Sequence, residues 1–135
     1  NGLNTGLMVA QYAQASLVSD NKTLAHPDSV DSIPTSANQE DHVSMGANGA
    51  RHLMEIVKNV TYVIAIELMC AAQAIDLREG GVEGMGEGTR IAYNKVREQV
   101  DFFDRDKEMS PAFEALKNLV ISEEILEAVA AGKTK

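Results

Sequence analysis

The sequence has little cysteine, few aromatic side chains and few prolines. Of 135 residues, one is cysteine, three are proline, none is tryptophan, and 4% are aromatic. A single cysteine, Cys70, excludes an internal disulfide, and its apolar neighbours predict a buried, unreactive thiol. We therefore expect a protein of a reducing compartment, the cytoplasm.

Basic residues are also scarce. The 12 Lys and Arg are outnumbered by 20 Asp and Glu, which gives a net charge of -8. Nucleic acids and anionic membrane surfaces bind clustered Lys and Arg, so this balance argues against both as partners. The longest apolar run, Val60 to Ile66, ends at Glu67. It is too short for a bilayer-spanning helix of about 20 residues, so we expect no membrane span.

What the chain does contain is helical periodicity. Hydrophobic residues make up 44% of the sequence, enough for the core of one domain. Their spacing follows helical steps, and no segment alternates as a strand would, so the predicted fold is all-α, a bundle of long helices. The predicted helices are 5–20, 42–78, 89–104, 111–120 and 122–131, with a polar loop at 21–41 and a glycine-rich connector at 79–88.

The segment 42–78 is the strongest helical signal. A helix of about 35 residues would span about 52 Å, whereas a compact chain of this size has a diameter of roughly 37 Å. Such a helix would need partners from other subunits or from further chain, so the pattern favours an oligomer. Its apolar stripe consists of Leu53, Ile56, Val57, Val60, Ile64, Leu68 and Ala71.

The stretch from Ile33 to Gly46 concentrates hydrogen-bonding side chains just before this helix. One interpretation is structural: Ser36 or Asn38 caps the helix, Gln39 completes a capping box with Ser36, and Glu40 and Asp41 stabilise the positive end of its dipole. The other is functional: Gln39 and Glu40 project into a cleft, where they could bind an ammonium group or an imidazole N–H. The two interpretations are compatible.

Other motifs carry less chemistry. His26, His42 and His52 form no metal-ligand pair, so no metal site is predicted. The glycines at 80–88 follow no strand and alternate with glutamates that would repel phosphate. We assign the three tyrosines to packing. Ser110 before Pro111 and Ser122 are the expected helix starts of the last two helices.

Several segments resemble one enzyme family. The segments are Gly6-Leu7-Met8, Ser19-Asp20-Asn21-Lys22, Leu24-Ala25-His26-Pro27, Ser29-Val30-Asp31-Ser32, Thr35 through Gly46 (TSANQEDHVSMG), and Ala72 through Arg78 (AQAIDLR). Together they are similar to the histidine ammonia-lyases, which belong to the aromatic amino acid lyases. The likeness is dense over about 1–46, and it implies that residues 1–135, which open at Asn1, form the carboxy-terminal helical segment of a longer enzyme.

The resemblance implies a cytoplasmic homotetramer that eliminates ammonia from L-histidine to give urocanate. Its electrophile would be a methylidene-imidazolone group (MIO), formed from an internal Ala-Ser-Gly, and its active sites would be assembled from several subunits. This chain has no Ala-Ser-Gly, since its nearest match is Ala15-Ser16-Leu17. The family's catalytic tyrosine also lies outside it, so we expect the isolated 135-residue chain to be inactive.

Carried over by resemblance, Glu40 is the glutamate beside the substrate, Gln39 is its polar neighbour, and Met8 lines the pocket for the substrate side chain. The phenylalanine lyases resemble this stretch but have an amide at position 40, so the carboxylate favours histidine. Two alternatives remain: a non-catalytic helical oligomerisation module, and a sister lyase or aminomutase acting on another aromatic amino acid.

Overall fold

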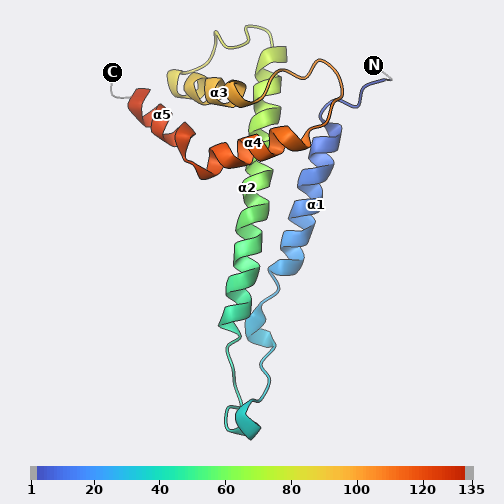
Figure 1. The fold of residues 1–135 in the computed structure, drawn as a ribbon, viewed down its shortest axis with the longest axis vertical. Helices are drawn as coiled ribbons and strands as arrows, with labels where there is room; N and C mark the ends of the chain where they lie inside the picture. The colour runs from blue at the N-terminus through green and yellow to red at the C-terminus, as the bar shows by residue number, and fades with distance from the viewer. Residues whose placement is uncertain (1–2, 133–135) are drawn as a thin grey trace. The chain divides into compact units, whose positions relative to one another are not determined.

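The protein consists of α-helices joined by ordered loops (Figure 1). The computed structural model describes residues 3–132, and within this range the only extended pairing is an isolated bridge between Thr35 and Glu40. The predicted all-α fold is confirmed. The elements are α1 (Met8–Leu24), two 3-10 helices η1 (Asp28–Val30) and η2 (Ser36–Asn38), α2 (Gly46–Leu77), α3 (Glu87–Gln99), α4 (Ser110–Ile121) and α5 (Glu124–Gly132).

Helix boundaries differ from the sequence prediction where local backbone chemistry overrides periodicity. The first helix continues past 20 to Leu24 and stops just before the His26-Pro27 step, which disfavours helix. The long helix begins at Gly46 instead of 42, because Met45 has a left-handed φ of 52° that helices exclude. The third helix ends at Gln99 instead of 104, because Val100 is extended.

The expected serine caps of the last two helices are wrong. Ser110 is already the first residue of α4, the cap position is Met109, and no side chain caps it. Ser122 is the residue that ends α4, and its hydroxyl donates to the Leu119 carbonyl at 3.2 Å. Between α4 and α5 the chain turns through Glu123, which has a left-handed φ of 61°. The serine patterns therefore located the start of α4 and the boundary between α4 and α5, but neither serine caps a helix in the expected way.

The chain divides into two compact units, where composition suggested one domain. We call the part made of residues 3–14 and 61–132 the helical-core unit, and the part made of Ala15–Val60 the loop unit. The units divide both α1 and α2 along their lengths, so each contains a piece of both helices.

The helical-core unit encloses an apolar core between α1, α2, α3 and α4. Gln73, only 7% exposed, is a polar residue at its edge, where its side-chain amide donates to the Phe103 carbonyl at 2.9 Å and accepts from the Phe103 N–H at 3.0 Å. This pair fixes the loop after α3 to α2. The buried apolar residues are Ala10, Ala65, Ile66, Met69, Ala72, Val96, Val100, Leu116 and Leu119.

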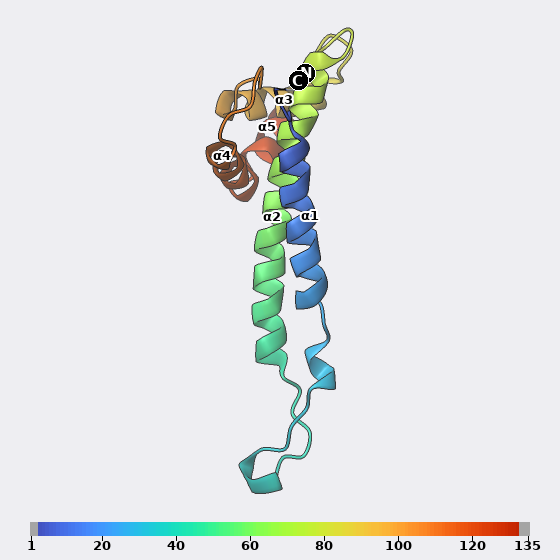
Figure 2. The ribbon, with the colours of Figure 1, turned by 90° about the vertical axis from the view of Figure 1, so that its right-hand side faces the viewer.

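The loop unit contains the second half of α1, the loop with η1 and η2, and the first part of α2. None of its residues is buried within the described chain. Polar contacts join its parts: Asn59 donates to Asn21 at 2.9 Å, and His52 lies 3.1 Å from Asp28. The Ser32 hydroxyl accepts from the Val43 N–H at 2.8 Å. Figure 2 shows the two arms of the loop side by side between α1 and α2 and the turn at η2.

The apolar stripe predicted on the long helix is not the face that this chain buries. The buried face of α2 is formed by Ala65, Ile66, Met69, Ala72 and Gln73. The stripe residues Leu53, Val57, Val60 and Ile64 are all exposed.

The 32 residues of α2 span about 48 Å. By length and composition alone α2 could cross a membrane, despite Glu67, although core helices of soluble proteins meet the same criterion.

Candidate functional site

The predicted site residues Gln39 and Glu40 lie in a tight turn of the loop unit, not at the start of a helix. Thr35 and Glu40 exchange both backbone hydrogen bonds, with N–H to O distances of 2.8 and 3.3 Å. Thr35 itself is extended, with φ -127° and ψ 176°, as the chain enters the turn. The pair forms the isolated antiparallel bridge, which closes residues 35–40 into a ring.

The backbone within this ring is left-handed at three successive positions. Ser36, Ala37 and Asn38 have φ values of 51°, 54° and 68°. Asn tolerates this region because its short polar side chain can bond locally, but Ala37 has no such compensation. Residues held in this region cluster at functional sites, where the surrounding contacts over-determine them. Here the reciprocal Thr35–Glu40 bonds supply such contacts.

The Glu40 carboxylate is exposed and is held from one side. Thr35 Oγ1 donates to Glu40 Oε2 at 2.8 Å. Within residues 3–132 the Glu40 side chain forms no other hydrogen bond, so Oε1 can accept from a ligand. Such a carboxylate can bind an ammonium group or an imidazole N–H.

The capping interpretation of this stretch is wrong. The long helix begins at Gly46, too far along the chain for Ser36, Asn38 or Asp41 to cap it. Gln39 does not form a capping box with Ser36, because its backbone N–H donates to the Ser36 carbonyl at 3.1 Å and closes the 3-10 turn. Glu40 and Asp41 therefore lie outside the first turn of that helix and gain nothing from its dipole.

Met8 belongs to the helical-core unit, whereas Gln39 and Glu40 belong to the loop unit. Met8 is the first residue of α1 and is 56% exposed. The Gln39 side chain is exposed as well. An exposed methionine can line an apolar pocket only if other polypeptide covers it. The roles of all three residues remain predictions.

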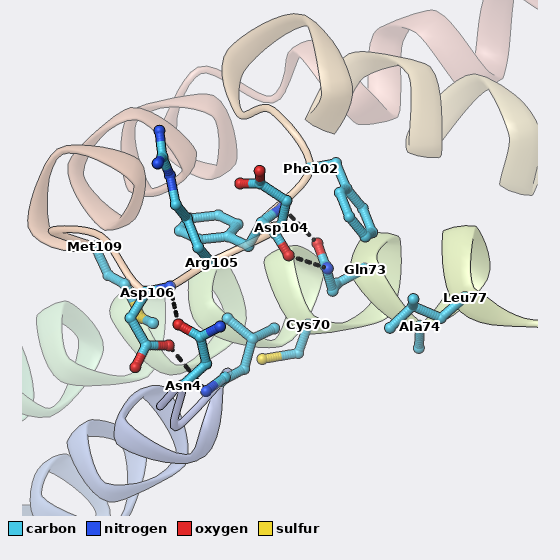
Figure 3. A pocket seen from close by; sticks show the side chains of 13 residues that line it. Asn4, Cys70, Gln73, Ala74, Leu77, Phe102, Asp104, Arg105, Asp106 and Met109 are labelled. Atoms are coloured by element: carbon cyan, nitrogen blue, oxygen red, sulfur yellow. Dashed lines mark hydrogen bonds between the residues drawn. The ribbon is translucent and has the colours of Figure 1, made fainter. Parts of the chain in front are cut away.

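The helical-core unit has a separate cavity of about 550 Å³ between α2 and the loop that follows α3. Figure 3 shows Cys70 and Gln73 contributed by α2, facing the loop that carries Phe102 and Asp104. Its walls are mostly apolar, and the Gln73 amide is already paired with Phe103. Burial, followed by the charge of Glu67, raises the pKa of the half-buried Cys70 thiol, which disfavours the thiolate form that a nucleophile requires.

One edge of this cavity is closed by a carboxylate that fixes the chain before α1. Asp106 accepts from the Thr5 N–H at 2.6 Å, the Thr5 hydroxyl at 3.0 Å and the Gly6 N–H at 2.9 Å. These bonds, led by the one from the Thr5 backbone, hold the pKa of Asp106 below its ordinary value. In return the Asp106 N–H donates to Asn4 Oδ1 at 3.2 Å (Figure 3). Asp106 is accordingly a structural anion.

The tyrosines do not share one packing role. Tyr12 is 66% exposed, so residues of this chain do not bury it. Tyr62 donates to Glu114, and Tyr93 donates to Asp76. The bond to Asp76, followed by burial, raises the pKa of Tyr93, which keeps the phenol protonated.

Cys70 is only partly buried, where a buried thiol was expected.

Two of the histidines pair with aspartates of the same loop. His52 contacts Asp28, and His26 lies 3.8 Å from Asp31. Within residues 3–132 no group of three His, Cys, Asp or Glu side chains is arranged to hold a metal ion. The candidate binding group is therefore the exposed Glu40 carboxylate on the turn at 35–40.

The sequence 1–98 matches the family model of the aromatic amino acid lyases. The chain belongs to this family. It is 56% identical over 128 residues to a histidine ammonia-lyase of Alkaliphilus oremlandii, a match that covers 95% of this chain and 25% of that relative. This aromatic amino acid lyase chain thus spans about a quarter of the length of the curated relatives it matches.

Solved structures of the family share the fold. The histidine ammonia-lyase of Trypanosoma cruzi aligns with a TM-score of 0.88 at 39% identity, over 96% of this chain and 25% of that one. A tyrosine aminomutase of Streptomyces globisporus aligns with a TM-score of 0.91 at 32% identity, over 98% of this chain and 25% of that one. Backbone similarity therefore does not separate lyases from aminomutases.

Aromatic amino acid lyases use the methylidene-imidazolone group. This chain does not contain the Ala-Ser-Gly from which that group forms, so its residues cannot supply it. What the chain offers is an acceptor carboxylate on an ordered turn. Sequence reasoning missed Thr35, because its relation to Glu40 depends on the backbone bridge and not on any helical or strand spacing.

Proposed function

We propose that this chain is the carboxy-terminal helical part of a histidine ammonia-lyase, which converts L-histidine to urocanate and ammonia. The observation that supports this most is the Glu40 carboxylate, exposed on the bridged turn with one oxygen able to accept from a ligand. The identity to histidine ammonia-lyases supports the same assignment.

The substrate chemistry matches this carboxylate. L-histidine offers an ammonium group and an imidazole N–H, and both form charge-assisted hydrogen bonds with a carboxylate. Glu40 would bind one of these donors and orient the amino acid, with Gln39 as a second polar contact and Met8 as part of an apolar wall beside the side chain. The reaction removes the amino group and a β-proton and leaves a carbon–carbon double bond.

The methylidene-imidazolone group would supply the electrophile that makes the amine a leaving group. Because this chain lacks Ala-Ser-Gly, that group has to come from other polypeptide of the enzyme. The 135-residue chain alone would therefore be inactive. Measurable urocanate from the purified chain and L-histidine would contradict this assignment.

A homotetramer in the cytoplasm completes the proposal. Large apolar side chains such as Met54, Val57 and Tyr12 are exposed in this chain, and such surface is normally covered by protein or lipid. Family membership favours protein, namely other subunits and further chain, over a membrane. Light scattering of the complete enzyme after size exclusion would give four subunits, and a monomer would contradict the proposal.

The proposed role of Glu40 is tested in the complete lyase. Glu40→Ala removes an acceptor for a charged donor and should lower kcat/KM for histidine by about 100-fold. Asp31→Ala is the matched control, because it removes an exposed carboxylate from the same loop and should change kcat/KM less than about twofold. Urocanate formation is followed by ultraviolet absorbance, and size exclusion checks assembly. Near-normal turnover of Glu40→Ala would remove Glu40 from the site.

One alternative has its own support. The similarity to the tyrosine aminomutase structure supports the alternative that the complete protein is a sister enzyme acting on another aromatic amino acid. Assaying the complete lyase with histidine, phenylalanine and tyrosine separates the two, because only the proposed enzyme would prefer histidine. A second alternative, a helical oligomerisation module without catalysis, is supported by the long exposed apolar face of α2, and it predicts no turnover of any substrate.

A further inference from the structure

Thr35 is the residue that contacts the proposed substrate-binding carboxylate directly. We propose that Thr35 is a positioning residue, whose hydroxyl holds Glu40 in the orientation that binds the substrate. This inference rests on the proposed function, because it assumes that Glu40 meets the substrate. Three features of the turn carry it: the backbone bridge, the direction of the side-chain hydrogen bond and the exposure of Glu40.

The backbone bridge sets the two side chains on one face. Residues that exchange both backbone hydrogen bonds in an antiparallel bridge lie directly opposite each other, with neighbouring side chains. Thr35 and Glu40 do so, and they are joined through the left-handed residues of η2. The position of Glu40 relative to Thr35 is therefore fixed by backbone geometry and not by chance contact of two flexible side chains.

The hydroxyl then fixes the carboxylate itself. Glutamate has three rotatable side-chain bonds, and an exposed one samples many rotamers unless it is tied. Thr35 is β-branched and half-buried, so its own χ1 is restricted and its hydroxyl is a well-placed donor. It donates to Oε2, and a bond to a charged acceptor is stronger than a neutral one. Oε1 is left for the substrate.

The hydrogen bond from Thr35 to Glu40 also has the chemistry that a positioning residue requires. The hydroxyl bonds one carboxylate oxygen and carries no charge, so it orders Glu40 without neutralising it as a lysine or arginine would. A substrate ammonium or imidazole N–H then meets a carboxylate that is ordered before binding. Pre-ordering of this kind lowers the entropy that binding would otherwise cost.

The test uses the complete lyase and two substitutions at Thr35. Thr35→Val keeps the shape and removes the hydroxyl, and we expect kcat/KM for histidine to fall about tenfold, mainly through a rise in KM. Thr35→Ser keeps the donor and should recover most of the loss. Thr23→Val is the matched control, because it makes the same change at an exposed position of α1. Unchanged kinetics of Thr35→Val would overturn the inference.

A double-mutant cycle separates positioning from general damage to the loop. If Thr35 acts through the Glu40 carboxylate, Thr35→Val should cost less than about twofold when Glu40→Ala, which removes the acceptor of the Thr35 hydroxyl, is already present. Full additivity of the two substitutions would overturn the inference.

The same cycle distinguishes failure here from failure of the proposed function. Strong loss in Glu40→Ala with normal Thr35→Val would reject Thr35 alone. Normal activity in Glu40→Ala would reject the proposed role of Glu40 and, with it, the role of Thr35. Loss in Thr35→Val that Thr35→Ser does not recover would mean that the hydroxyl is not the group that matters.

Discussion

In the helical-core unit, apolar side chains from four helices are buried against one another. The loop unit buries none of its residues, and hydrogen bonds join its parts. The difference matters because burial of apolar surface is the main source of folding free energy, while each hydrogen bond adds little in net terms. The helical-core unit therefore has its own source of stability. The loop unit depends on specific polar contacts, and it carries the proposed substrate-binding turn.

The largest loss of stability is expected when a cavity is made in the apolar core of the helical-core unit. Leu116 is fully buried, so Leu116→Ala should lower the free energy of unfolding by about 2–5 kcal/mol. Leu126→Ala is the matched control, because Leu126 is 67% exposed in this chain. Chemical denaturation of the complete lyase compares the two. Equal losses would mean that Leu126 is covered by polypeptide outside this chain.

A polar residue in the helical-core unit should have an intermediate effect. Gln73→Leu keeps similar volume but leaves the Phe103 N–H and carbonyl without their partner, which should cost about 1–3 kcal/mol. The exposed residue Gln99 provides the control Gln99→Leu. The same denaturation experiment measures both. A neutral Gln73→Leu would show that this contact does not stabilise the loop after α3.

The smallest effect is expected in the loop unit. Ser32→Ala removes the acceptor for the Val43 N–H and should cost about 0.5–1.5 kcal/mol locally. Hydrogen exchange measured by mass spectrometry should speed up in peptides that contain Val43, with global stability nearly unchanged. Ser29→Ala, at an exposed position of η1, is the control. A global loss as large as that of Leu116→Ala would contradict the contrast between the units.

The same contrast explains what the sequence could predict. Helical periodicity predicted the all-α fold, because apolar spacing reports burial directly. It did not select the face of α2 that this chain buries: the predicted stripe included Leu53, which is exposed here, and left out Met69, which is buried. The choice depends on which other polypeptide covers each face.

The proposed site was found by resemblance, and its geometry could not be derived from spacing. The polar stretch before the long helix suggested capping by Ser36 or Asn38, but left-handed residues at 36–38 and at Met45 move the helix start to Gly46. Left-handed conformations of serine, alanine and methionine have no sequence signature. The Thr35–Glu40 bridge follows from these same angles, so it was equally hidden.

The role of Glu40 in substrate binding can be seen in a crystal structure of the complete lyase with a bound, unreactive analogue of L-histidine. We expect a Glu40 carboxylate oxygen within about 2.6–3.2 Å of the imidazole or ammonium nitrogen of the analogue. We also expect the hydrogen bond from Thr35 to be retained. A Glu40 carboxylate turned away from the bound analogue, with no polar contact to it, would show that Glu40 does not bind the substrate.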